Sequence, residues 1–381
     1  MMIKLACAGV VCVLLAAGLS PFRSPKNHVS WIPKQNGLHF ERYSSILSAG
    51  EFHKSNGDNG TSESIEVRLE PESVNASHTI LAFDDSDHPG PGFSLRQYKN
   101  ALVVRQPYID QQNKPDFRWL AVANAFHKGQ RVLVTVTMSG DRVQIYLDGV
   151  LKETFASRGS SANNLTGRLV VANASRDNDS WQGQVLGLGM YNRPLTAERV
   201  EEHRSSWQAN GGPRGSGDGV FALYLFNEHQ GNVAHNQLDT ATDLTIPPRY
   251  FILHPRFVAS VAHDYQPTVE YWEDVAVNVL GFVPLGFVWM IYFSQVRPLN
   301  HPVAITVALG LFISLTIEVS QVFFPTRSSG VTDLITNTAG TTLGVVIYHM
   351  EPLKKWSTMA WGSNTSISSA ARTECSSSAC Y

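Results

Sequence analysis

The sequence predicts a multidomain chain, with an all-β sandwich outside a membrane and an α-helical bundle of about four transmembrane helices. Only 16% of the 381 residues are charged, whereas about a quarter is usual in soluble proteins, so part of the chain avoids water. The apolar residues concentrate in four long runs. Between the first and second runs, short segments alternate apolar and polar residues and are separated by turn residues, which is typical of β-strands.

The composition excludes three classes of protein. Because 30 Lys and Arg oppose 32 Asp and Glu, the formal net charge is −2, which argues against a general nucleic-acid binder. With 43% hydrophobic residues, the chain is too apolar for global disorder. Four cysteines are too few for a disulfide scaffold. Cys7 and Cys12 lie in an apolar run and suit packing roles, while Cys375 and Cys380 can pair or stay free in a Ser-rich tail.

The four apolar runs predict membrane-spanning helices, because each approaches the roughly 20 residues that cross a bilayer. The first run can also be a cleaved signal peptide, since Ala16, Ala17 and Gly18 are small. The runs are Leu5–Phe22, Val275–Phe293, Val303–Phe324 and Leu334–Met350. The predicted organisation is a signal-anchor helix within 1–24, a β domain over 30–250, three helices (275–293, 303–324, 334–350) within 270–352, and a disordered cytoplasmic tail over 353–381.

Basic residues predict the orientation in the membrane. Lys4 flanks the first run, Arg297 lies between the second and third, and Lys354 and Lys355 follow the fourth. Short loops rich in Lys and Arg stay in the cytoplasm. Both termini are then cytoplasmic, whereas the β domain and the loop 325–332 lie outside.

The β region contains one strong hairpin signal. Arg142–Leu147 alternates in polarity and is followed by Asp148-Gly149, and both central residues of a type I′ hairpin turn need positive φ. The spacing of the predicted strands suggests an antiparallel sandwich with one concave face. Further strands are predicted over Ser64–Leu69, Thr79–Phe83, Ala101–Arg105, Arg131–Met138, Val150–Phe155, Arg168–Ala172 and Val185–Tyr191.

Four segments of this region resemble the laminin-G-like, concanavalin A-like jelly roll. They are Gly37–Phe40, Val143–Gly149, Trp181–Gly183 and Leu188–Thr196, with a short helix expected after them at Glu198–His203. The resemblance covers nearly the whole β region. It implies that the domain binds a glycan or a protein, sometimes with Ca²⁺.

Two acidic clusters are weak candidates for Ca²⁺, and no other cofactor is expected. Such an ion needs six to eight oxygen ligands, but the same residue types also build ordinary solvated turns, so both interpretations stay open. Exposed aromatic residues can stack on sugars, although jelly-roll cores use them too. The acidic candidates are Asp84, Asp85 and Asp87, and Asp177, Asn178 and Asp179; the aromatic candidates are Trp31, Tyr98, Trp119 and Trp181.

Polar residues recur at helical spacing in the last three apolar runs. Asp274 and Asn278 are four residues apart and so share a helix face. The same holds for Asp333 and Asn337, while Glu318 and Gln321 are three apart. In the predicted orientation these residues reach the outer ends of their helices. The predicted polar membrane cluster is Asp274, Asn278, Glu318, Gln321, Arg327, Asp333 and Asn337.

This cluster has two interpretations. Ionisable groups within a membrane are candidates for a substrate or lipid-headgroup site, but they can also lock helix packing by satisfying one another. Arg327 is the only Lys or Arg in its loop. We therefore expect a network in which Arg327 bridges Glu318 and Asp333, with Gln321 and Asn337 as hydrogen-bond partners.

The order and spacing of these residues resemble the VanZ family of small membrane proteins. That family has an earlier helix, which the first apolar run would supply, with the β domain inserted in the first outer loop. This is the reason to expect an uncleaved first run. The resemblance implies a bacterial cell-membrane protein related to the cell envelope or to glycopeptide response. The pattern is Asp274-x3-Asn278-x2-Gly281-Phe282-x-Pro284-Leu285-Gly286, Glu318-x2-Gln321-x3-Pro325-x-Arg327 and Asp333-x3-Asn337-x2-Gly340-x3-Gly344.

Small residues within the same motifs predict how the helices pack. Gly340 and Gly344 suit close helix contact, while Gly281, Pro284 and Gly286 are expected to loosen or kink the second predicted helix of the membrane region. The spacing Asp-x3-Asn-x2-Gly occurs twice, from Asp274 and from Asp333. It suggests either a parallel internal repeat or shared helix-start chemistry.

Three functions remain open from the sequence. The favoured one is an envelope membrane protein whose outside domain recognises a glycan or a protein, with membrane lipid as a further partner and no nucleic acid. The second is an enzyme that acts on an amphiphilic envelope substrate at an outer-face pocket, although no catalytic motif is identified. The third is an adhesion or receptor protein whose bundle serves as an anchor.

Overall fold

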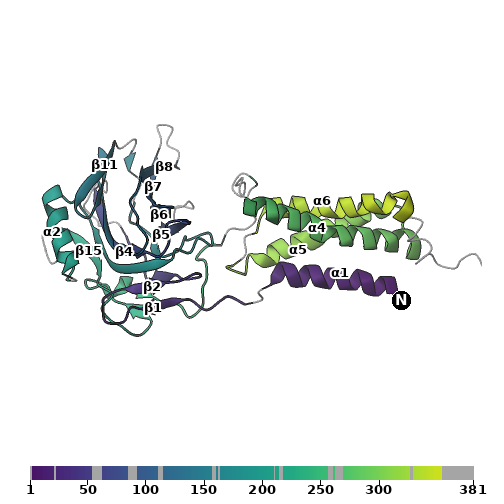
Figure 1. The fold of residues 1–381 in the computed structure, drawn as a ribbon, viewed down its shortest axis with the longest axis horizontal. Helices are drawn as coiled ribbons and strands as arrows, with labels where there is room; N and C mark the ends of the chain where they lie inside the picture. Colours follow the sequence, from purple (N-terminus) through teal and green to yellow (C-terminus); the bar gives the residue numbers. More distant parts are fainter. Residues whose placement is uncertain are drawn as a thin grey trace, which may run out of the picture. The chain divides into compact units, whose positions relative to one another are not determined.

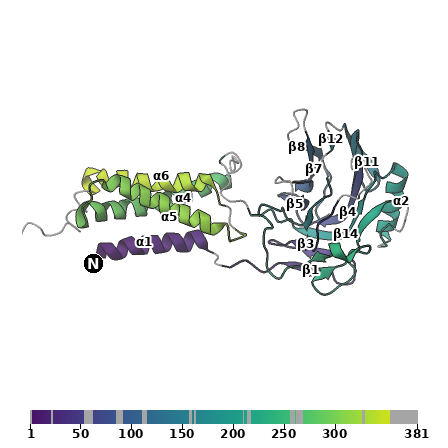
Figure 2. The ribbon, with the colours of Figure 1, turned by 180° about the vertical axis from the view of Figure 1, so that it is seen from behind.

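The structure, a computed structural model, divides the chain into two compact units. One consists of Met1–Arg23 and Arg256–Tyr381, and the other of Ser24–Pro255. Figure 1 and Figure 2 show the first as a helical bundle and the second as a β sandwich. The residues described are 2–20, 23–53, 62–84, 92–109, 115–156, 160–161, 164–209, 211–213, 218–255, 261, 269–326 and 329–353.

The β unit is an antiparallel sandwich of two sheets, which confirms the predicted fold class of this part. In hydrogen-bonded order, the first sheet runs β1-β2-β14-β4-β9-β10-β11, with β15 on β14, and the second runs β12-β7-β6-β5-β13-β3-β17-β16, with β8 on β7. The strands are β1 Val29–Trp31, β2 Leu38–Phe40, β3 Ile46–Ser48, β4 Glu63–Pro71, β5 Ser77–Asp84, β6 Ser94–Tyr98, β7 Ala101–Ile109, β8 Pro115–Val122, β9 Val132–Met138, β10 Arg142–Leu147, β11 Val150–Ala156, β12 Ser160–Ser161, β13 Arg168–Val171, β14 Gly183–Tyr191, β15 Val220–Tyr224, β16 Val233–Ala234 and β17 Leu244–Thr245.

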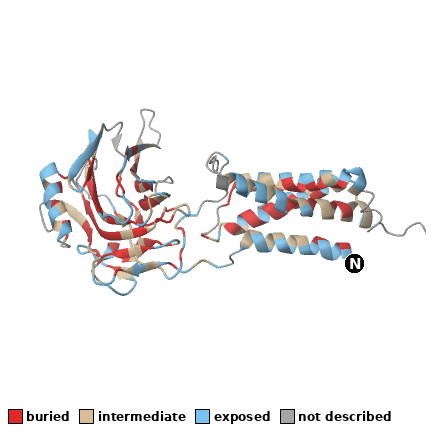
Figure 3. Ribbon diagram, in the orientation of Figure 1, coloured by how far each residue is buried: buried red, intermediate tan, exposed pale blue. Residues whose placement is uncertain are grey.

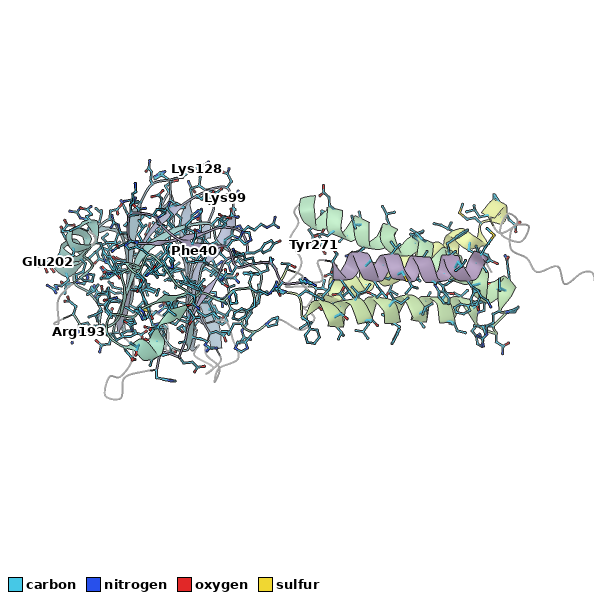
Figure 4. All side chains as sticks on the ribbon, turned by 90° about the horizontal axis from the view of Figure 1, so that it is seen from below. Phe40, Lys99, Lys128, Arg193, Glu202 and Tyr271 are labelled. Atoms are coloured by element: carbon cyan, nitrogen blue, oxygen red, sulfur yellow. The ribbon has the colours of Figure 1, made fainter. Side chains whose placement is uncertain are left out.

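The core of this unit lies between the two sheets (Figure 3). Alternation puts every second side chain of a strand on the inner face, and Ile65, Val67 and Leu69 of β4 are all fully buried there. Phe40 lies inside the sandwich, whereas Lys99 projects from its surface (Figure 4). The predicted hairpin is confirmed, because β10 pairs with β11 and Asp148 and Gly149 have φ of 49° and 81°.

A buried ion network joins helix α2 (Ala197–Gln208) to the first sheet. Glu66 on β4 is fully buried. One of its oxygens accepts hydrogen bonds from the Tyr191 hydroxyl at 2.7 Å and the Trp207 indole at 2.9 Å, and the other accepts from Thr135 at 3.2 Å. This carboxylate lies on the face of β4 opposite the sandwich core, beneath α2, and its donors come from three different elements.

His203 of α2 stands between two carboxylates in this network. Its Nδ1 is 3.1 Å from Glu66 and its Nε2 is 3.1 Å from Asp218, which is also bound by Arg199. Both ring nitrogens donate only when the imidazole is protonated. Burial lowers the pKa of His203, but its hydrogen bonds and charge interactions with Glu66 and Asp218 outweigh burial, so the pKa is raised above 6.5.

The β unit should therefore lose stability at alkaline pH. Because the folded pKa of His203 is raised, its stabilisation is complete below the ordinary value and is lost as the pH rises through the raised value. We expect His203→Gln to cost about 3 kcal/mol of unfolding free energy at low pH, since it leaves the buried Glu66 carboxylate without its cation, while Asp218 keeps Arg199. We also expect the pH dependence to become flatter. The measurement is thermal unfolding of the full chain, followed by circular dichroism, from about pH 6 to pH 9.

The control is His28→Gln, since His28 pairs with Glu41 at the surface, where both side chains are about half exposed, and such pairs contribute little. Equal losses in the two variants, or a pH profile unchanged by His203→Gln, would contradict the assignment of a buried imidazolium.

The helical unit contains α1 (Met2–Leu19), α4 (Val269–Ile291) with a π-helical turn at Tyr292–Val296, α5 (Pro302–Gln321) and α6 (Val331–His349). These helices lie side by side (Figure 1, Figure 2). Large apolar side chains such as Leu280, Phe312 and Val346 point outward and are exposed, as expected for surfaces that face lipid. The stretch of α4 from Trp272 to Trp289 is about 26 Å long, close to the roughly 30 Å of a hydrocarbon core.

Among the described residues, three helices are long and apolar enough to cross a membrane. They are Met2–Leu19, Tyr271–Val296 and Pro302–Gln321. The expected number of about four is thus corrected to three candidate spans. Helix α6 falls short because Asp333, Asn337 and several Thr and Gly residues lower its hydropathy. These small and polar residues serve instead to pack α6 against α4 and α5.

Glycines bring α4 and α6 into backbone contact. A Cβ added at Gly340 would collide with the Val279 carbonyl oxygen, and one at Gly344 with that of Val283. Similarly, a Cβ at Gly286 would meet the carbonyl oxygen of Thr341. Gly281, in contrast, makes no such close contact, because a Cβ there would meet nothing within 4 Å. Pro284 lies inside α4, which continues through it to Ile291.

Candidate functional site

A cavity of about 510 Å³ opens within the helical unit, at the end of the bundle where α4 and α6 begin and α1 and α5 end. It brings together six of the seven residues of the predicted polar cluster. Volumes between about 300 and 1,000 Å³ are typical of sites for small molecules. The lining consists of Leu14, Ala17, Gly18, Asp274, Val277, Asn278, Gly281, Phe282, Ile317, Glu318, Gln321, Thr326, Asp333 and Asn337.

The last turn of α1 forms one wall of the cavity. Its residues Leu14, Ala17 and Gly18 line the space, and the Gln321 side-chain nitrogen donates a hydrogen bond of 2.8 Å to the Gly18 carbonyl oxygen. Gly18 also packs against Ile317, since a Cβ at this position would lie 2.7 Å from that side chain. The N-terminal helix is therefore part of the site as well as a candidate span.

The polar lining changes from exposed at the rim to buried at the floor. Asp274 is exposed, Asn278 and Asp333 are half-buried, and Glu318 and Asn337 are buried. The Asn278 amide donates to Asp333 at 2.7 Å, which joins the two copies of the Asp-x3-Asn motif.

Glu318 accepts a hydrogen bond of 2.9 Å from the backbone N–H of Gly330, in the turn just before α6. Asn337 donates to the Ser314 hydroxyl at 3.0 Å. The floor of the cavity is thus tied to the start of α6 and to the middle of α5.

Two buried amide oxygens in the lining stand out. Within the part of the chain that the structure describes, Gln321 Oε1 and Asn337 Oδ1 have no hydrogen-bond partner, although both side chains are more than nine-tenths buried. The orientation of the Gln321 amide follows from its hydrogen bond, because the opposite orientation would place its oxygen against the Gly18 carbonyl. An acceptor buried without a donor costs about 1–3 kcal/mol.

The predicted network around Arg327 is settled only in part. Arg327 itself lies outside the described residues, so its bridge between Glu318 and Asp333 stays a prediction. In the described region the nitrogen of Gln321 binds Gly18 and that of Asn337 binds Ser314, and the part that their oxygens play in the network also stays a prediction. Sequence spacing could not reveal these contacts, because each joins helices that are distant along the chain.

The described lining is rich in acceptors. It contains the carboxylates of Asp274, Glu318 and Asp333. The nitrogens of the three lining amides each donate to protein atoms, so the oxygens of these amides remain as acceptors. A ligand that suits this lining carries hydrogen-bond donors, such as hydroxyl or ammonium groups. No His, Cys or Ser occurs among the described lining residues.

The two acidic clusters of the β unit do not converge on a common point within the described residues. Asp84 is 3.2 Å from Arg176 and 3.1 Å from His254, whereas Asp179 is 3.0 Å from Arg96. Asp85 and Asp87 lie outside the described residues, and Asp177 is half-buried. Among the residues that are described, no group of three or more His, Cys, Asp or Glu side chains is arranged to hold a metal ion, so a Ca²⁺ site stays a prediction.

The aromatic candidates divide into two groups. Trp181 is buried and donates to Gln97 at 2.7 Å, and Trp31 donates to the Gly231 carbonyl at 2.9 Å. Tyr98 and Trp119, in contrast, are 58% and 56% exposed.

Comparisons with known proteins match both units, although the first match below also includes β15, β16 and β17 of the β unit. Residues 219–353 match the model of the VanZ/LLP1 family, and residues 48–201 match that of the Concanavalin A-like lectin/glucanases superfamily. The chain is 35% identical over 77 residues to Protein VanZ of Enterococcus faecium, a match that spans 20% of this chain and 45% of the relative. It therefore covers less than half of the length of that relative.

Solved structures that are partly similar to this chain include the following two. The binding domain of Botulinum neurotoxin DC in complex with rat synaptotagmin II is 16% identical, with 49% of this chain and 46% of that chain covered and a TM-score of 0.37. A heptameric SAP-like pentraxin from Limulus polyphemus is 15% identical, with 58% and 93% covered and a TM-score of 0.34. The chain thus combines a VanZ-like segment with a concanavalin A-like jelly roll.

The contact between Asn278 and Asp333 gives a test of the site geometry. Asn278→Asp would place two carboxylates together, and we expect it to cost about 2 kcal/mol, seen as a lower midpoint in thermal aggregation of the detergent-solubilised chain. The double change Asn278→Asp with Asp333→Asn exchanges donor and acceptor, so it should recover at least half of the loss. If the double variant is as unstable as Asn278→Asp alone, these two side chains do not interact as described.

Proposed function

We propose that this chain is an integral membrane protein of a bacterial cell envelope. Its bundle binds the polar head of a membrane amphiphile, and its jelly roll recognises a glycan or a protein outside the membrane. The observation that carries the proposal is the pair of buried acceptors, Gln321 Oε1 and Asn337 Oδ1, which belong to two residues of the cavity lining and have no donor among the described residues. A hydroxyl or ammonium group in the cavity would satisfy them.

The position of the cavity supports an amphiphile rather than a soluble ligand. The cavity lies near the ends of α1, α4 and α5, each of which contains a candidate membrane span. Its polar residues are thus close to the depth where lipid headgroups meet water, while Leu14, Val277 and Phe282 in the same lining suit the upper part of an acyl chain.

The Lys and Arg distribution supports placing the cavity at the outer leaflet. Arg297 lies in the loop that joins α4 to α5, at the opposite end of the bundle from the cavity. Lys4 lies near the start of α1, at the same end as Arg297. Because cytoplasmic loops carry the excess of basic residues, the cavity end then faces away from the cytoplasm, together with the jelly roll.

The ligand assignment predicts a preference among lipids. Phosphatidylethanolamine and phosphatidylglycerol carry donors in their heads, whereas phosphatidylcholine carries none. We expect native mass spectrometry of the full chain in detergent to show about tenfold tighter binding of the first two, a difference of about 1.4 kcal/mol. Gly281→Leu should abolish this binding, because its side chain would extend into the open space of the cavity.

Gly9→Leu is the matched control. Gly9 lies on α1, a Cβ there also meets nothing within 4 Å, and the residue is exposed and does not line the cavity. It should bind lipid as the unaltered chain does. Equal binding of all three lipids, or binding that survives Gly281→Leu, would contradict the proposal.

The orientation has its own test. In a chain whose native cysteines are replaced by Ser, Lys128→Cys in the jelly roll should react with an impermeant maleimide added to intact cells. Asn300→Cys, between α4 and α5, should react only after the cells are opened. Both positions are exposed in the structure, so burial does not limit either reaction. The reverse pattern would put the cavity at the cytoplasmic leaflet.

A further inference from the structure

The cavity of the helical unit has its mouth on the side of α1 and α4. The lining residues of α5 and α6, such as Glu318 and Asn337, are buried or half-buried. The exposed members of the described lining all belong to the other two helices, and they are Ala17 on α1 and Asp274, Val277 and Gly281 on α4. Helices α5 and α6 therefore form the floor of the cavity, and the opening lies between α1 and α4.

Helix α1 changes its neighbour along its length. Away from the cavity it packs on α4, where Cys7 joins a buried apolar cluster with Met290 and Ile291. In its last turn, beside the cavity, it is held by α5, because the Gln321 side chain donates to the Gly18 carbonyl oxygen at 2.8 Å. The end of α1 that lines the cavity is thus fixed to α5 rather than to α4.

Gly281 marks the open part of the interface between α1 and α4. It shares one stripe of α4 with Asp274 and Val277, which precede it by seven and four residues. A Cβ at Gly281 would meet nothing within 4 Å, and Val277 is 67% exposed although it lines the cavity. We call this opening the α1–α4 slot, bounded by Leu14 and Ala17 of α1 and by Val277 and Gly281 of α4.

The slot lies at the depth of acyl chains. The candidate span of α4 begins at Tyr271, so Val277 and Gly281 lie about 9 and 15 Å further along the helix. A hydrocarbon core is about 30 Å thick. Asp274 is only about 5 Å from the start of the span, which is closer to the headgroups. The slot therefore faces hydrocarbon, whereas the floor behind it is polar.

We propose that the cavity opens sideways into the bilayer through the α1–α4 slot, and that a lipid occupies both. Its head lies on the polar floor, where hydrogen-bonding groups are needed, and an acyl chain lies in the slot, where apolar surface is covered. The inference rests on the membrane amphiphile proposed above. It adds the route by which the amphiphile enters and the requirement that it carry an acyl chain.

The route is tested by electron paramagnetic resonance of the full chain in phosphatidylcholine nanodiscs, with native cysteines replaced by Ser. A nitroxide on Gly281→Cys should be relaxed more by oxygen, which concentrates in lipid, than by a water-soluble nickel chelate. Leu280→Cys is the lipid reference, because Leu280 is 66% exposed and does not line the cavity. Lys128→Cys, exposed on the jelly roll, is the water reference. A label reached mainly by the nickel chelate, or by neither reagent, would overturn the slot.

The acyl chain is tested by native mass spectrometry of the full chain in detergent. We expect Val277→Trp to weaken binding of diacyl phosphatidylethanolamine about tenfold, because the larger side chain takes the place of acyl chain in the slot. Leu280→Trp is the matched control, since Leu280 lies on the same helix, is equally exposed and is outside the lining. It should bind as the unaltered chain does. Glycerophosphoethanolamine, the same head without acyl chains, should bind at least about tenfold more weakly than the diacyl lipid.

The inference is wrong if Val277→Trp binds the diacyl lipid as the unaltered chain does, or if the chain-free head binds as tightly as the lipid. The two proposals can fail separately. Equal binding of all three lipids together with an oxygen-dominated label at Gly281 would refute the headgroup assignment alone. A nickel-dominated label with the lipid preference intact would refute the slot alone.

Discussion

The helical unit depends on backbone contact between α4 and α6. Gly340, Gly344 and Gly286 each stand where a Cβ would collide with a carbonyl oxygen of the facing helix. Such small residues let helices approach closely and pack without the hydrophobic effect that drives association in water. The contact fixes the register of the two helices, so that Asn278 meets Asp333 and the polar ends of both helices share one cavity.

The buried polar groups of the two units differ in whether their hydrogen bonds are complete. This difference distinguishes a structural network from a candidate ligand site. In the jelly roll, Glu66 receives donors from Thr135, Tyr191, Trp207 and His203, and its charge is balanced by His203 between the first sheet and α2. The cavity of the bundle keeps the oxygens of Gln321 and Asn337 without donors in the described region. A closed network stabilises one packing arrangement, whereas an incomplete one next to an open space is suited to a partner from outside.

The sequence predicts those features that follow from local pattern. The alternation of apolar and polar residues predicted most of the long strands, and Asp148-Gly149 predicted the hairpin. The helical spacing of the polar residues predicted that six of them share one end of the bundle, namely Asp274, Asn278, Glu318, Gln321, Asp333 and Asn337. Strands β6 and β8 were not expected, because their polar and aromatic residues lack a clear alternation.

Long-range contacts were beyond the reach of the sequence. Gln321 binds Gly18, although the two residues are about 300 positions apart along the chain. Glu66 binds Thr135, Tyr191 and Trp207, which are also distant in the sequence and become neighbours only through the order of the strands and the packing of α2. Hydropathy also overcounted the spans, because α6 carries the polar residues of the site and the small residues of the helix contact.

The repeated motif has one consequence for how such a protein can change over evolution. Its two glycines occupy different surroundings, since Gly340 is held against the backbone of α4 while Gly281 faces the cavity with free space around it. Position 340 therefore tolerates no larger residue without separating the helices. Position 281 can accept larger side chains at little expense to the fold, and each replacement would reshape the cavity. A single codon change at position 281 would therefore alter the lining of the cavity while the contact between α4 and α6 stays intact.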